Sequence, residues 1–350
     1  MLRRKRNALM ADINNGLKNN PFVLGSGVGA VNHFARNAKL RHSVLPVIPK
    51  LPTLLPEPEQ TISFAPSFGF PEQTPHPFKI KYNCYSQSGA PFVFGASNNN
   101  EQRLLHTIIE SRKFLESVII FTSHRRPCTS DYDIIIDLIL FTQDWPYGPT
   151  ILGGADIGAT QWDDTKFPAF PTYSRIVFNL NHPLFITADA PVIFNLNNAS
   201  VWSVMPVLIH ETLHCLGMGY AEPKTRGWDR LLDESRTWYI GLNGNPEGSQ
   251  AIAAYRESFG PQFSRIPIEN SFGGPGSAWS HFEEGLDDNE DPESRTFDYG
   301  TGPIVHPPLS VEIMSTLVNS SVFVFSKITA GTLADLGYAV NMNCPFLEVY

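Results

Sequence analysis

The stretch Ser203–Gly219 reads SVMPVLIHETLHCLGMG. Its residues are mostly apolar, Ser203 is a residue type that caps helix N-termini, and Pro206 is tolerated in a first helical turn. Gly217 and Gly219 are typical of the end of a helix. The stretch therefore predicts a buried helix that begins near Ser203 and ends at the two glycines.

Inside this helix lies the pentapeptide His210-Glu211-Thr212-Leu213-His214. Residues i and i+4 share one helix face, so both imidazoles point the same way, as two zinc ligands require. Glu211 lies about 100° further round and can reach a metal-bound water without binding the metal itself. A chain of this composition contains HExxH by chance on the order of once in a hundred cases. Two histidines and a glutamate on a buried helix nevertheless need partners, which favours one catalytic zinc ion.

A catalytic zinc takes three protein ligands and keeps one position open. Gly217 stands where the pattern HExxHxxGxxH has its glycine, but Tyr220 occupies the position of the last histidine. We interpret Tyr220 as a packing residue. The third ligand must therefore come from elsewhere in the chain.

Several further segments carry a family resemblance. They are Ile151–Ala155, Arg175–Asn179, Tyr239–Gly241 with Ala251–Tyr255, Ile266–Asn270 followed by Gly273-Gly274, Ser277–Glu284 (SAWSHFEE), Val311–Ser315 (VEIMS) and Ser326–Tyr338. Together with HETLH they are similar, in the right order, to the leishmanolysin-type metzincin proteases and their bacterial relatives. The resemblance covers roughly residues 100–341. Phe282 departs from it, because the family usually has tryptophan there.

The resemblance implies an α+β fold with the two lobes of a metzincin zinc protease. Residues 79–220 would form an N-terminal catalytic lobe with a twisted mixed sheet and the HExxH helix. Residues 221–350 would form a C-terminal lobe with the third ligand and the Met-turn. The edge strand above the cleft would be Arg175–Asn179 or Pro191–Asn197.

The resemblance also implies the site. His281 would be the third zinc ligand, after a long insertion that follows the helix, and Met314 would occupy the Met-turn beneath the metal. Glu234, on a predicted helix, and His306, in a predicted loop beside two prolines, remain rival ligands. The expected activity is endopeptidase cleavage of a protein or peptide substrate, with a zinc-bound water and Glu211 as general base.

The alternative function is a catalytically idle or assembly-associated structural protein that keeps the metzincin fold. Residues 1–78 favour such a role, because they form a basic arm followed by closely spaced prolines between Val44 and Pro77. Such spacing forbids helix and central strand and favours an extended strap or linker, with a removed propeptide as another reading. This arm is the expected route into any larger assembly.

Composition limits the other function classes. The net charge of −8 gives no reason to expect a nucleic-acid surface. No apolar run approaches the about 18 residues of a membrane span, and Ala8–Ala11 is too short for the core of a signal peptide. We therefore expect no transmembrane segment, and a cytoplasmic or particle-associated location rather than classical secretion.

Two weaker readings concern cysteine and calcium. The widely spaced Cys84, Cys128, Cys215 and Cys344 are expected to be free thiols, with masking of the metal by Cys84 as a minor alternative. The acidic run Glu283–Glu293 is expected to be a solvated loop, although its carboxylates are of the type that holds calcium.

Hydrophobic periodicity places the remaining elements. It predicts a strand at 79–84, a helix at 99–121, a buried strand at 131–142, and further strands at 150–156, 175–179 and 191–197.

Overall fold

The computed structural model of the chain describes fifteen segments. They are residues 22–23, 78–95, 99–122, 132–143, 152–155, 161–163, 170–182, 191–194, 200–202, 204–219, 227–270, 279–283, 295–315, 317–318 and 322–347. Within them the protein is α+β, with a mixed sheet and four α-helices. The predicted fold class is therefore correct at this level.

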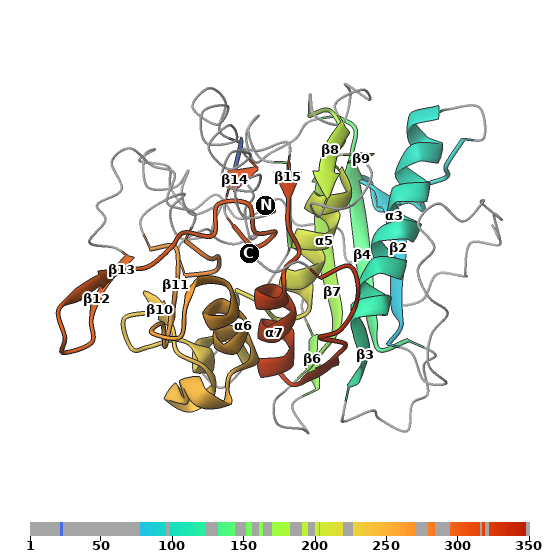
Figure 1. Ribbon diagram of the computed structural model, residues 1–350. Helices are drawn as coiled ribbons and strands as arrows, with labels where there is room; N and C mark the ends of the chain where they lie inside the picture. The colour runs from blue at the N-terminus through green and yellow to red at the C-terminus, as the bar shows by residue number, and fades with distance from the viewer. Residues whose placement is uncertain are drawn as a thin grey trace, which may run out of the picture.

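A mixed sheet organises the half of the molecule that carries HETLH (Figure 1). Three strands run parallel in the order β2 (Ile80–Ser86), β4 (Ile134–Phe141) and β7 (Phe170–Asn179). Two short strands pair antiparallel with β7, namely β5 (Gly153–Ala155) and β6 (Gln161–Asp163). The buried strand β4, IIIDLILF, is almost continuously apolar, as expected for a central parallel strand.

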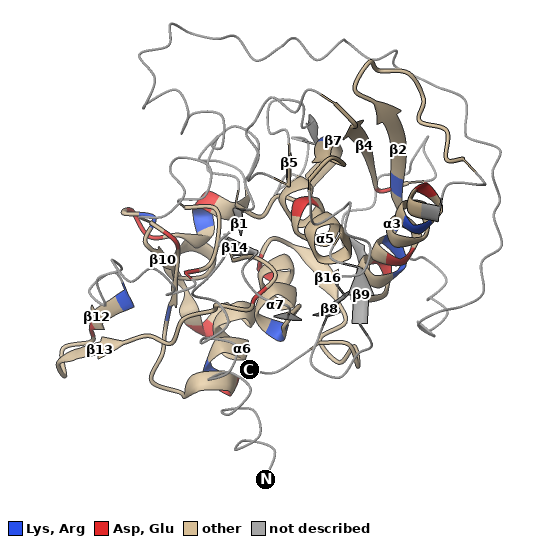
Figure 2. Cartoon of the chain, turned by 90° about the horizontal axis from the view of Figure 1, so that it is seen from above, with Lys and Arg blue, Asp and Glu red and all other residues tan. Residues whose placement is uncertain are grey.

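Two helices pack against the same side of this sheet (Figures 1 and 2). Helix α3 (Asn99–Val118) contacts β2, and helix α5 (Val204–Cys215) contacts β5 and β7. Figure 2 shows α5 between the sheet and helix α7 (Lys327–Asp335). All residues of α5 are buried, so this helix lies inside the core rather than on the surface.

The other half of the molecule is built around α7 and α6 (Gln250–Phe259), which pack against each other. Short elements surround them. They are the 3₁₀ turns η3 (Gly227–Leu231), η4 (Leu242–Gly244) and η5 (Pro246–Gly248), and the antiparallel pairs β10 (Trp238–Tyr239) with β11 (Ile266–Pro267) and β12 (Thr296–Asp298) with β13 (Pro303–Val305).

Distant parts of the chain meet in three small pairings. Strand β8 (Pro191–Phe194) lies between β9 (Ser200–Trp202) and β15 (Val322–Phe323). Strand β3 (Ile119–Thr122) pairs with β16 (Tyr338–Val340), and β1 (Phe22–Val23) pairs with β14 (Leu317–Val318).

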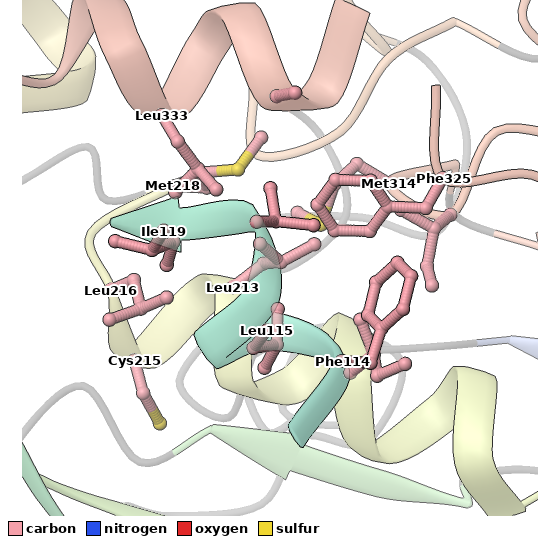
Figure 3. Close-up of a cluster of buried hydrophobic side chains, with 14 of the residues drawn as sticks. Phe114, Leu115, Ile119, Leu213, Cys215, Leu216, Met218, Met314, Phe325 and Leu333 are labelled. Atoms are coloured by element: carbon pink, nitrogen blue, oxygen red, sulfur yellow. The ribbon is translucent and has the colours of Figure 1, made fainter. Parts of the chain in front are cut away.

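One apolar core runs through both halves (Figure 3). Phe114 of α3 meets Phe325 edge to face, with ring centroids 5.1 Å apart. Leu213 of α5 and Met314 lie in the same cluster, with Leu333 of α7. Burying each such side chain contributes about 1.5–3 kcal/mol, so the two halves stabilise one another.

Most predicted elements form with shifted ends. The helix predicted over 99–121 ends at Val118, because the following β-branched residues Ile119 and Ile120 enter strand β3. The strands predicted at 79–84, 131–142, 150–156, 175–179 and 191–197 correspond to β2, β4, β5, β7 and β8.

The predicted edge strand is wrong. Arg175–Asn179 belongs to β7, which has β4 on one side and β5 on the other. Pro191–Phe194 is the middle strand of the separate β15-β8-β9 sheet. The strand that ends the main sheet beside α5 is β5.

The described residues bear on few of the remaining expectations. The arm 1–78 lies outside them apart from Phe22–Val23 and Phe78. No helix in the described part of the chain has the length and apolar character to cross a bilayer. Cys84, Cys215 and Cys344 are free thiols, as predicted.

Candidate metal centre

Helix α5 ends in a glycine cap that also orients a histidine. The Met218 N–H donates to the Leu213 carbonyl (3.1 Å) and the Gly217 N–H to the His214 carbonyl (2.8 Å), which is the Schellman pattern. Gly217 has a φ of 103°, which glycine adopts without steric cost. Nδ1 of His214 then donates to the Met218 carbonyl at 2.9 Å. The turn that ends the helix therefore fixes this imidazole.

The second segment of the site, residues 279–283, is held by backbone hydrogen bonds on both sides of His281. Trp279 has a φ of 69°, which is uncommon for a bulky residue. Its N–H donates to the Glu269 carbonyl at 2.6 Å, and its carbonyl accepts from the Trp228 indole N–H at 2.7 Å. The His281 carbonyl accepts from the Glu269 N–H at 3.0 Å. These bonds hold the strained turn and present His281 to α5.

The structure brings His210, His214 and His281 together in one fully buried group. Each of the three Nε2 atoms lies 3.1 Å from the other two. The rings of His210 and His281 are stacked with 13° between their planes, and His214 stands edge-on to both. Three ring nitrogens therefore converge on a single point.

Hydrogen bonds set the tautomers of two of these rings. Nδ1 of His210 lies 2.6 Å from the Ile313 carbonyl, and Nδ1 of His214 contacts the Met218 carbonyl. A carbonyl oxygen only accepts, so each Nδ1 carries the proton and each neutral ring keeps a lone pair on Nε2. Backbone carbonyls that orient a histidine in this way are a common feature around metal ligands.

Burial also keeps these imidazoles uncharged. It lowers the pKa of His214 to about 4, and the hydrogen bond to Met218 offsets part of that effect. It lowers the pKa of His210 well below the ordinary value, with further contributions from the neighbouring His214 and His281. Converging lone pairs of neutral rings repel one another unless a cation lies between them.

The donor set fits zinc. Zn–N bonds of about 2.0–2.1 Å in tetrahedral geometry separate two ligand nitrogens by about 3.3 Å. The observed separation of 3.1 Å is close to this value. Three imidazoles also match the ligand count of a catalytic zinc site, which leaves one position open.

Glu211 follows His210 on α5 and is fully buried. Neither of its carboxylate oxygens has a hydrogen-bond partner of standard geometry among the described residues. Burial raises the pKa of Glu211 well above its ordinary range, and the Ala155 backbone N–H opposes this effect. A Cβ placed on Gly153 of β5 would lie 3.7 Å from Cγ of Glu211, so the sheet edge packs directly against this side chain.

Met314 lies in a tight turn next to the histidines and is fully buried. Its carbonyl accepts from the N–H of Phe282, the residue after His281, at 2.9 Å. The preceding residue, Ile313, supplies the carbonyl that contacts His210. The turn expected beneath the metal therefore contacts both segments that carry the three histidines, α5 and 279–283, through its backbone.

The rival ligands lie apart from this group. Glu234 is exposed in a turn rather than on the predicted helix. His306 is buried in an aromatic cluster, where Nε2 lies 2.9 Å from the Tyr299 hydroxyl and the Trp238 ring is centred 4.7 Å away. Within the described segments the three histidines are the one group of potential metal ligands.

The expectations for Cys84, Tyr220 and the acidic run 283–293 concern residues away from the histidine group or outside the described segments. Cys84 lies on β2, at the far end of the sheet from β5, and does not belong to the histidine group. Tyr220 and the acidic run beyond Glu283 lie outside the described residues.

Sequence reasoning missed the residues that act through their backbone. A Cβ on Gly219, where φ is 75°, would lie 2.6 Å from the Ser280 carbonyl oxygen and 2.9 Å from two atoms of the His214 ring. Gly219 therefore allows the His281 segment to approach His214, whereas the sequence marks it only as a helix end. No side-chain signal identifies the Ile313 and Met218 carbonyls.

Comparison with models of known protein families finds no match for this chain. Comparison with curated proteins finds no match either.

Proposed function

We propose that this protein is a zinc-dependent endopeptidase with a two-lobed, leishmanolysin-like metzincin fold. One observation carries the proposal: three buried Nε2 atoms lie 3.1 Å from one another, and the helix that supplies two of them also carries the buried Glu211. Among the described residues, the Glu211 oxygens have no hydrogen-bond partner of standard geometry, and three neutral imidazoles converge through their lone pairs. Both arrangements cost free energy, which metal binding and catalysis would explain.

His210, His214 and His281 would hold the ion. When bound, zinc supplies a Lewis acid that polarises a carbonyl and makes water a stronger nucleophile near neutral pH. Glu211 accepts the proton of the attacking water and delivers it to the amine of the leaving group. The same carboxyl must both take up and release a proton, so it has to be ionised when the water attacks.

Substrate binding is proposed at β5. This strand ends the described order β2-β4-β7-β5 and packs against Glu211 through Gly153. An extended peptide can add to such an edge as a further antiparallel or parallel strand. Its scissile bond would then lie beside the carboxyl that moves the proton.

The deciding experiment measures zinc per chain by elemental analysis, with casein digestion on the same samples. We expect one zinc in the wild type, and digestion that a chelator abolishes. Glu211→Gln should keep the zinc and lose turnover by about a hundredfold or more. His281→Ala should lose zinc and activity together.

Other results would redirect the proposal. Unchanged zinc in His281→Ala would show that His281 is not the third ligand and would refute the proposed ligand set. Wild-type protein with neither zinc nor digestion would refute the protease and favour the structural, assembly-associated role. Zinc without digestion would indicate an idle site, an inhibitory arm within residues 1–78, or a narrower substrate range.

A further inference from the structure

The turn that contains Met314 connects the histidine site to helix α7. On one side, the Ile313 carbonyl accepts from Nδ1 of His210 at 2.6 Å, and the Met314 carbonyl accepts from the Phe282 N–H at 2.9 Å. The position of this turn therefore determines where the carbonyl oxygens of Ile313 and Met314 lie. Any movement of the turn changes the hydrogen bond that orients His210.

On the other side of the turn, Glu312 points its carboxylate at the start of α7. Its side chain is buried, and one oxygen, Oε1, accepts from the Ser326 N–H at 3.2 Å. The same oxygen accepts from the Thr329 hydroxyl. Ser326 is the N-cap of α7 and Thr329 lies in its first turn, where the helix dipole favours negative charge.

Helix α7, which binds this carboxylate, is held in place by its contacts with α6. A Cβ on Gly331 would lie 2.6 Å from the backbone nitrogen of Ala251, so α7 and α6 are in near backbone contact. Asp335, at the other end of α7, accepts from the Gln250 N–H at 2.8 Å and from the Tyr239 hydroxyl at 2.6 Å. The helix is therefore fixed to α6 along its length.

The backbone ties the turn to two neighbouring segments, one around Phe282 and one around Val324. The Ile313 N–H donates to the Val324 carbonyl at 2.8 Å, and the Val324 N–H donates to the Val311 carbonyl at 2.7 Å. These bonds align the turn with the neighbouring chain segments. Glu312 adds a side-chain link from the turn to the start of α7.

We propose that Glu312 is a positioning residue for the metal site, because its buried carboxylate fixes the turn whose Ile313 carbonyl holds His210 with Nε2 free for the ion. This inference rests on the proposed zinc function and names a residue that neither binds the metal nor touches the substrate.

The first test examines metal-free protein by NMR of ¹⁵N-labelled histidine, at about pH 8, where imidazoles are neutral. In the wild type we expect His210 as the Nδ1–H tautomer with a slowly exchanging proton. Glu312→Ala should give mixed tautomers and fast exchange. Glu312→Gln keeps an oxygen acceptor and should restore the wild-type signals.

Asp335→Ala is the matched control. It removes a half-buried acceptor from the far end of the same helix without touching the turn, while the close contact of Gly331 with Ala251 remains. It should therefore lower stability and leave the His210 signals unchanged. Equal changes in His210 for Asp335→Ala and Glu312→Ala would overturn the proposal. If Glu312→Ala does not fold, Thr329→Val, which removes one donor to the carboxylate, decides by the same signals.

Zinc affinity gives a second readout. Loss of a residue that orients a ligand through its hydrogen-bond partner weakens metal binding about tenfold. A folded Glu312→Ala protein with unchanged affinity and unchanged His210 signals would refute the inference. A wild type that binds zinc but cleaves no peptide would refute the protease alone, since the tautomer and affinity comparisons need no turnover.

Discussion

Gly219 offers the sharpest test of how the site is packed. In Gly219→Ala the new Cβ would lie 2.6 Å from the Ser280 carbonyl oxygen, whereas ordinary contacts begin at 3.4 Å. The Ser280 backbone would have to retreat by about 0.8 Å, and a shift near 1 Å at a reacting centre costs on the order of a hundredfold. Because His281 follows Ser280, we expect zinc to bind at least tenfold more weakly.

The stability cost of Gly219→Ala has two parts. Left-handed backbone costs a non-glycine residue about 1–2 kcal/mol, and overpacking a filled site costs about 1–3 kcal/mol. Gly300→Ala separates them, because Gly300 has a φ of 84° and nothing within 4 Å of its Cβ position. We expect Gly300→Ala to show only the backbone cost and normal zinc affinity.

Urea unfolding and chelator competition on both variants measure these effects. Zinc affinity in Gly219→Ala equal to that in Gly300→Ala would show that close packing of Ser280 on His214 does not determine the ligand geometry. Equal free energies of unfolding in the two variants would show that a Cβ at position 219 does not overlap the Ser280 carbonyl oxygen.

Three further predictions concern the core and its charge. Phe282→Trp overfills a fully buried position, so it should lower the free energy of unfolding by about 1–3 kcal/mol in urea titrations. Phe325→Ala removes the ring that contacts Phe114 and should lower the free energy of unfolding, measured in the same way, by about 3–5 kcal/mol. A decrease below about 1 kcal/mol would contradict a core shared by the two halves. Burial lowers the pKa of His214 and of His306 to about 4, so the unfolded chain binds protons first as the pH falls. Metal-free protein should therefore lose stability as the pH drops from about 6.5 to 4 and regain it when the pH is raised again. Urea midpoints that stay constant across this window would contradict burial of the two imidazoles in their neutral form.

Local pattern was enough to predict α5 and most strands. The apolar run around HETLH and the glycines after it define a buried, capped helix, and the β-branched run of β4 defines a central strand. These features depend on neighbours within a few residues, which the sequence displays directly.

Long-range order was harder to predict. The sheet order places β5, not β7, at the edge beside Glu211, and nothing in the apolar pattern of either strand encodes its neighbours. The helix expected to continue to 121 stops at Val118, because the next residues pair with β16 from the far end of the fold. Tertiary pairing overrides local helical periodicity there.

At the candidate site, sequence identified the side chains but not their supports. The spacing of His210 and His214 follows from helix geometry, and His281 came from resemblance alone. The supports are the Ile313 and Met218 carbonyls, which every residue type possesses. Only the folded backbone reveals which carbonyl faces which ring.

The pairing of β3 with β16 has a consequence for the order in which the protein matures. Tyr338, the first residue of β16, packs its ring against Phe78 and Phe170 and donates its hydroxyl hydrogen to the Leu216 carbonyl, just beyond α5. During synthesis the segments around these partners emerge long before Tyr338, and such distant contacts form slowly. The sheet and the HETLH helix therefore complete their packing only after β16 has been made, and a chain that has not reached Tyr338 lacks the contact that holds the end of α5.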